Sequence, residues 1–167
     1  MKRDLTDRTT EKRKRVVLAL VLSSYMIVGI DGSLVITAIT EIAAELHLDH
    51  TALSWVQNAY VLAFGGFMLA GGRLGDMYGR RLTFIVSLVL FGVGSLGAGI
   101  SPSAMWMVVS RFTQGVGSAI MAPAALGLIV DYFEGRERVK AVAWYGSISP
   151  AFPKKILTMR KFFAANR

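Results

Sequence analysis

The sequence contains no cysteine, which excludes disulfide bonds and thiol chemistry from this chain. Charged residues are also few, at 18% against 53% hydrophobic residues, and long stretches have none: residues 54–72 and 82–100 are uncharged throughout. A soluble domain of this length spreads charges over its surface and has shorter apolar runs. We therefore interpret the chain as an all-α membrane protein.

Four segments are long and apolar enough to cross a bilayer as helices, which takes about 20 residues each. They lie at about residues 16–40, 54–73, 82–100 and 104–130. An incomplete fifth helix is predicted at about 140–152, because its uncharged part would cover only ~20 Å of a hydrocarbon core of ~30 Å. Residues 1–15 form a basic N-terminus, and residues 153–167 form a basic tail.

The basic residues alternate with these segments. Lysine and arginine occur in residues 1–15, 73–81 and 131–140, whereas residues 41–53 and 101–103 contain neither. Positive residues stay on the cytoplasmic side, so we expect a multi-pass protein of the cell membrane with its N-terminus in the cytoplasm. The net charge of +8 is explained in this way, and no nucleic acid partner is expected. Trp55 and Trp106 then belong to the outer aromatic belt.

Two lone charges lie inside predicted spans, Asp31 in the first and Arg111 in the fourth. Such a charge costs about 2.5–3.5 kcal/mol on insertion scales and marks a substrate or proton path by default. Helix rise places them ~13 Å and ~10 Å from the outer ends of their spans. We therefore expect Asp31 and Arg111 to form a charge pair. The alternatives are a wetted Asp31 near the interface and an Arg111 that snorkels to it.

A short charged segment separates the second and third spans. It holds three glycines, three arginines and one aspartate between residues 72 and 81, which indicates a tight cytoplasmic turn. Glycine is also dense inside the spans, where it lets helix backbones approach closely. Gly71 and Gly75 form one such G-x-x-x-G pair.

Three blocks carry a family resemblance. Gly72-Arg73-Leu74-Gly75-Asp76-Met77-Tyr78-Gly79-Arg80-Arg81 resembles the loop signature G-x-L-x-D-R-x-G-R-R of major facilitator superfamily transporters, with Met77 in place of arginine. The segment from Arg111 to Ala119 is similar to the fourth-helix pattern R-x-x-Q-G-x-G-x-A. The segment from Asp31 to Ile39 resembles the first-helix pattern D-x-T-I-V-N-V-A-L of the drug:proton antiporter branch with fourteen helices, with Ile36 in place of asparagine.

The resemblance covers residues 16–149 and implies the N-terminal four to five transmembrane helices of a major facilitator superfamily fold. It implies a transporter and not an enzyme, which exports drugs or other small molecules and is driven by protons without a cofactor or a metal. Its partners would be the lipid bilayer, protons and a small-molecule substrate such as a lipophilic drug. The sequence does not name that substrate.

The resemblance also implies residue roles. Asp76, before the third helix, would latch the outward-facing state with Arg80 nearby, and Arg111 would favour the ionised form of an acid such as Asp31. The cytoplasmic gating loop would comprise Gly72, Gly75, Asp76, Gly79, Arg80 and Arg81. The fourth-helix motif would comprise Arg111, Gln114, Gly115 and Gly117.

Beyond residue 149 the sequence departs from the family. We expect a truncation or frameshift there; an amphipathic basic tail on anionic lipid is the alternative. Two interpretations of function follow, a segment of a proton-driven exporter and an inactive fragment of one. A small membrane scaffold is a third, which no motif supports.

Overall fold

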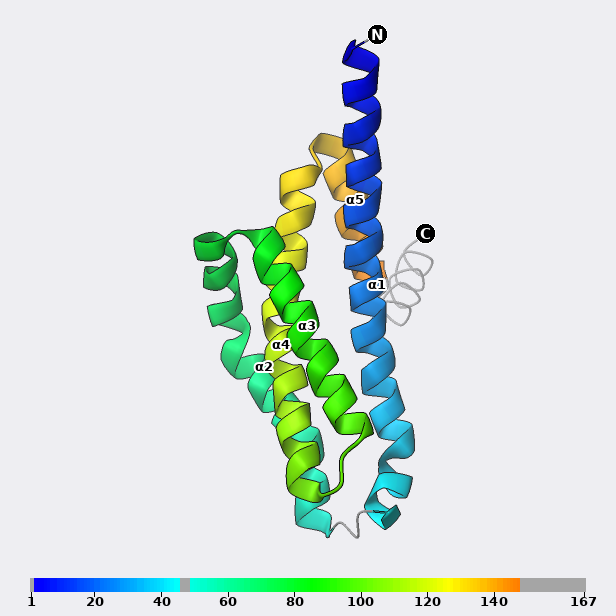
Figure 1. Ribbon diagram of the computed structural model, residues 1–167, viewed down its shortest axis with the longest axis vertical. Coiled ribbons are helices and arrows are strands. Elements are labelled where there is room, and N and C mark those ends of the chain that lie inside the picture. The colour runs from blue at the N-terminus through cyan, green and yellow to red at the C-terminus, as the bar shows by residue number, and fades with distance from the viewer. Residues whose placement is uncertain (1, 46–48, 148–167) are drawn as a thin grey trace, which may run out of the picture. The chain divides into compact units, whose positions relative to one another are not determined.

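The computed structural model describes residues 2–45 and 49–147, which form helices joined by short connections (Figure 1). They are α1 (Lys2–Glu45), α2 (His50–Tyr78), α3 (Arg80–Gly99), α4 (Ala104–Tyr132) and α5 (Gly135–Ser147). The described residues contain no strand, and the predicted all-α fold class is confirmed. Four helices contain stretches long and apolar enough to cross a membrane: Glu11–Val35 in α1, and the whole of α2, α3 and α4.

The chain divides into two compact units. Among the described residues, one unit joins those up to Gly32 with those from Ile129 to Ser147, and the other lies within Ser33–Leu128. The first unit thus holds most of α1, the end of α4 and α5. The second holds the end of α1, all of α2 and α3, and most of α4.

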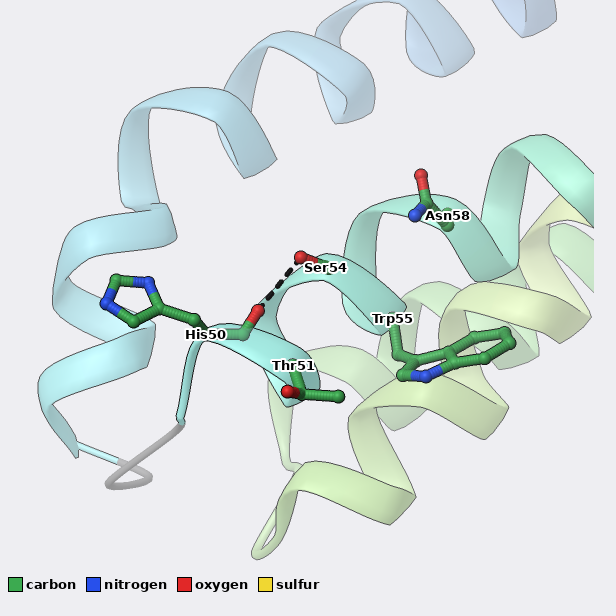
Figure 2. A pocket seen from close by; sticks show the side chains of 5 residues that line it. All are labelled: His50, Thr51, Ser54, Trp55 and Asn58. Carbon is green, nitrogen blue, oxygen red and sulfur yellow. Dashed lines mark hydrogen bonds between the residues drawn. The ribbon is translucent and has the colours of Figure 1, made fainter.

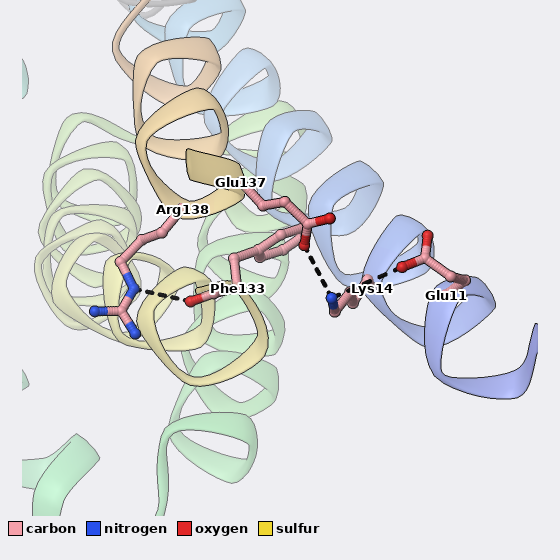
Figure 3. A network of polar contacts seen from close by, with 5 residues as sticks. All are labelled: Glu11, Lys14, Phe133, Glu137 and Arg138. Atoms are coloured by element: carbon pink, nitrogen blue, oxygen red, sulfur yellow. Dashed lines mark hydrogen bonds and ion pairs between the residues drawn. The ribbon is translucent and has the colours of Figure 1, made fainter. Parts of the chain in front are cut away.

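In the first unit, α5 packs beside α1. The ammonium of Lys14 lies 2.9 Å from a carboxylate oxygen of Glu137 and 3.7 Å from one of Glu11 (Figure 3). Farther along, the rings of Tyr25 and Tyr145 lie 4.6 Å apart between centroids. A polar contact near one end and an aromatic contact farther along therefore align the two helices.

The end of α4 is closed by an arginine from α5. Arg138 donates a hydrogen bond of 2.8 Å to the carbonyl of Phe133 (Figure 3). It donates a second one, of 3.0 Å, to the carbonyl of Val130. The last carbonyls of a helix have no partner within the helix, so these bonds satisfy groups that would otherwise need water. The chain turns between the helices at Gly135, where φ is +50° and a side chain would be strained.

In the second unit, α4 packs closely against both α2 and α3. A Cβ atom on Gly71 of α2 would lie 2.7 Å from the Cα of Ile120. A Cβ atom on Gly117 would lie 2.7 Å from the backbone nitrogen of Phe91 in α3. Both distances are too short for a real side chain, so glycine is what permits these backbone approaches, as is typical of helix contacts in membranes.

The helix boundaries differ from the predicted ones. The predicted turn over residues 73–81 is too long: α2 continues to Tyr78, α3 begins at Arg80, and Gly79 alone separates them with φ +85°. The charge pattern marks where spans leave the membrane and not where helices end, so helical turns outside the core escape it. For the same reason α1 begins at Lys2 and not near residue 16, and α5 begins at Gly135 and not near 140. Residues 148–152 of the predicted fifth helix, and the tail at 153–167, lie outside the described residues.

Candidate functional site: a buried arginine in α4

Arg111 lies inside the second unit with only 4% of its surface exposed. Its guanidinium donates a hydrogen bond of 2.8 Å to the side-chain oxygen of Gln114, one turn further along α4. The central guanidinium carbon also lies 4.7 Å from the centroid of the Tyr60 ring, which α2 contributes. This is cation–π geometry, because the cation faces the negative surface of the ring. The charge is therefore held by groups from two helices.

Gly115 explains how Tyr60 comes so close. A Cβ atom on Gly115 would lie 2.5 Å from the carbonyl oxygen of Tyr60 and 2.8 Å from the Cβ of Ala63. Residues 111 and 115 are one turn apart on the same face of α4. The missing side chain at Gly115 therefore brings the backbone of α2 against α4 at the level where the Tyr60 ring meets Arg111.

Gln114 packs closely against α3, again at a glycine. It is 1% exposed, and a Cβ atom on Gly94 would lie 2.7 Å from its Cγ and 2.8 Å from its backbone nitrogen. The side chain thus packs against the backbone of α3 while its amide oxygen accepts the hydrogen bond from Arg111. The four residues of the predicted fourth-helix motif thus serve one arrangement: Arg111 is the charge, Gln114 its acceptor, and Gly115 and Gly117 admit α2 and α3.

The structure brings together some of the residues of the predicted gating loop. Arg80 donates a hydrogen bond of 2.9 Å to the carbonyl of Gly127 in α4, and Gly75 packs beside the Arg80 side chain. Gly79 supplies the break between the helices, while Asp76 and Arg81 are exposed and Gly72 is half-buried.

Asp76 precedes α3, as predicted, but it does not lie at the N-terminus of that helix. Asp76 lies within the last turn of α2, because only Gly79 separates that helix from α3. The N-cap position of α3 is Gly79 itself, and no side chain caps it.

Asp31 lies in α1, within the first unit, and is half-buried. Arg111 belongs to the second unit. Their expected charge pair therefore stays a prediction.

A pocket with a volume of about 330 Å³ lies at the start of α2 (Figure 2). It is lined by His50, Thr51, Ser54, Trp55 and Asn58. Ser54 donates to the carbonyl of His50 at 2.8 Å, so its hydroxyl already has a partner. Trp55 is 53% exposed, as expected for an aromatic-belt residue.

Sequence reasoning missed Tyr60 and Gly127. A tyrosine inside an uncharged span is a usable signal, because its hydroxyl and its electron-rich ring face both need suitable neighbours in a membrane. Gly127 carries no such signal, since its role depends on an arginine 47 positions away. In the part of the chain that the structure describes, no three histidine, aspartate or glutamate side chains gather as a metal site would require.

Comparison with known proteins identifies the family. The family model of the Major Facilitator Superfamily matches residues 21–153. The chain belongs to the Major Facilitator Superfamily. This is a family of transporters, so the expectation that the chain is not an enzyme is confirmed.

Among its superfamily relatives, the chain is 41% identical over 133 residues to the puromycin resistance protein pur8 of Streptomyces alboniger. It is 35% identical over 148 residues to the lincomycin resistance protein of Streptomyces lincolnensis, and 36% identical over 136 residues to the cephamycin export protein CmcT of Amycolatopsis lactamdurans. These matches cover 79%, 85% and 80% of this chain, but only 26%, 31% and 28% of the relatives. The chain thus spans about a quarter to a third of their length.

Proposed function

We propose that the chain is a segment of a proton-coupled exporter of antibiotics or other small molecules, in the cell membrane, with its N-terminus in the cytoplasm. The observation that carries the proposal is the agreement between two independent findings. Relatives of this segment bear the names of resistance and export proteins. A buried arginine lies within a membrane-length helix, where an ionisable residue marks a path for ions or substrate.

Protons are the proposed driving ion, and Asp31 is the proposed carrier. A cation in a medium of low dielectric constant attracts an acid more strongly than in water. Arg111 would therefore hold Asp31 ionised until substrate or a proton arrives, and the exchange would couple the two. Asp76 and Arg80 would act in the cytoplasmic gate.

The alternative is that the 167-residue chain transports nothing by itself. It covers 31% or less of the three relatives named above, and major facilitator sites form at the midplane between inverted repeats. Expression of this chain alone is then expected to give no more efflux than an empty vector.

A chimera tests the first proposal, whereas expression of the chain alone tests the alternative. The matched region of the puromycin resistance protein would be replaced by residues 16–147 of this chain, and puromycin efflux measured in energised cells with and without an uncoupler. We expect uncoupler-sensitive efflux that is lost with Asp31→Asn. A chimera that inserts and has the melting temperature of its parent, yet exports nothing, would contradict the proposal.

A further inference from the structure

We propose that Tyr60 is the positioning residue for Arg111: its ring, and not its hydroxyl, holds the guanidinium at one depth and one orientation in the bundle. The inference deepens the proposed function and rests on it for its role in transport. The contact itself does not depend on transport and can be tested alone.

The ring of Tyr60 faces the buried cation directly. The central guanidinium carbon of Arg111 lies 4.7 Å from the centroid of that ring. The neighbouring ring on α2, that of Phe64, lies 6.3 Å from Tyr60 and nearly parallel to it. One ring thus faces the cation and the next supports it from the same helix.

The contact matters because Arg111 is buried. A desolvated guanidinium interacts with a ring face more strongly than an exposed one does. Gln114 fixes one nitrogen of the guanidinium by its hydrogen bond. The ring face, 4.7 Å from the central carbon, adds a constraint that acts on the plane of the group.

The position of the Tyr60 ring follows from the packing of the α2 backbone against α4. Tyr60 stands at a close approach of α2 to α4, since its own carbonyl oxygen would lie 2.5 Å from a Cβ on Gly115. The Tyr60 position is therefore set by backbone packing, whereas Arg111 has a long side chain that must be directed. Tyr60 therefore positions the side chain of Arg111, and not the reverse.

The test uses phenylalanine analogues with zero to three ring fluorines at position 60 of the 167-residue chain in detergent micelles. Each fluorine withdraws electrons from the ring face and weakens a cation–π contact while changing shape little. We expect the unfolding equilibrium constant to rise by roughly 2- to 30-fold over the whole series, with its logarithm linear in the number of fluorines. The same series at Phe64 is the matched control and should be flat.

A second arm places the series at position 60 in the Arg111→Gln background, where the slope should vanish. A flat series at position 60 with Arg111 present, or an equal slope at Phe64, would overturn the proposal. If Arg111→Gln does not fold, the comparison of positions 60 and 64 decides alone.

The transport role has its own readout in the puromycin chimera. Tyr60→Phe keeps the ring and should retain the pH dependence of efflux, whereas Tyr60→Leu should shift it. A flat fluorine series in an active chimera refutes positioning by Tyr60 but not export. If the fluorine series shows the expected slope in a chimera that folds but does not export, the proposed function is refuted. Tyr60 then keeps a positioning role that is unconnected to efflux.

Discussion

The guanidinium of Arg80, at the first position of α3, donates a hydrogen bond of 2.9 Å to the carbonyl oxygen of Gly127 in α4. A Cβ atom on Gly127 would collide with the aliphatic part of the Arg80 side chain. The glycine therefore makes room for the arginine that bonds to it. The contact ties the beginning of α3 to α4 beside the break at Gly79.

This relationship makes the effects of two substitutions non-additive. Arg80→Ala and Gly127→Ala should each destabilise the chain by about 1–2 kcal/mol, because both remove a hydrogen bond from a charged donor. The double variant should be little worse than either single one, since the contact can be lost only once. Reversible unfolding in mixed micelles measures all three, and Arg81→Ala, at an exposed arginine, is the control. Additive losses would show that the residues act separately.

Two glycines with different surroundings should respond in opposite ways to alanine. Gly117→Ala should cost roughly 1–3 kcal/mol, because its Cβ would meet the backbone of Phe91 and Ser87, which cannot move aside as a flexible side chain can. Gly92→Ala should be neutral or stabilise by up to about 1 kcal/mol, because nothing lies within 4 Å and alanine favours the helix. Thermal unfolding in detergent compares them, and equal effects would argue against close packing of α4 on α3.

The polar contacts of the first unit should contribute unequally to the stability of the chain. Lys14→Ala removes an ion pair whose glutamate is mostly exposed, and such pairs contribute little to stability because water and salt screen them. Arg138→Ala leaves two carbonyls at the end of α4 without their donor and should cost more, about 1–2 kcal/mol. Unfolding in low and high salt distinguishes them further, because only the Lys14 effect should shrink with salt. The reverse ranking would remove the capping role from Arg138.

The expected pair of Asp31 and Arg111 can be examined by a double-mutant cycle. Asp31→Asn and Arg111→Gln each leave one charge uncompensated, so each should cost more alone than in combination, with a coupling of about 0.5–3 kcal/mol. Asp31→Asn combined with Arg138→Gln is the control and should be additive. An additive result for the first pair would favour an Asp31 that is simply hydrated.

The expected orientation can be examined with single cysteines, since the native chain has none. Thr51→Cys should react with a membrane-impermeant thiol reagent in whole cells, because Thr51 is exposed and belongs to a predicted external segment. Thr9→Cys should react only after the cells are opened. The opposite labelling pattern would place the N-terminus outside.

Composition and charge predicted the fold class and the presence of four membrane-length helices, because membrane insertion acts on apolar length and on charge position. They did not predict that Gly79 would be the whole connection between α2 and α3, because helix ends depend on backbone dihedral angles at a single residue. A pattern of charges does not report those angles.

Arg111 could be singled out from sequence because a charge in an apolar span is conspicuous, and burial makes its surroundings specific. The partner Tyr60 could not be paired with it. That contact depends on the register of α2 against α4, which Gly115 sets by its lack of a side chain. Periodicity within one helix contains no information about the register between two.

The glycines of α4 have a consequence for movement. Gly115 fits the backbone of α2 and Gly117 fits that of α3, while Gly71 and Gly94 receive α4 in return. If α4 slid by one residue along α2 or α3, a side-chain carbon would replace a glycine hydrogen at a helix contact that is too close for a carbon atom. These three helices are thus interlocked in one register, and any rearrangement that preserves their packing must carry them together as a single piece.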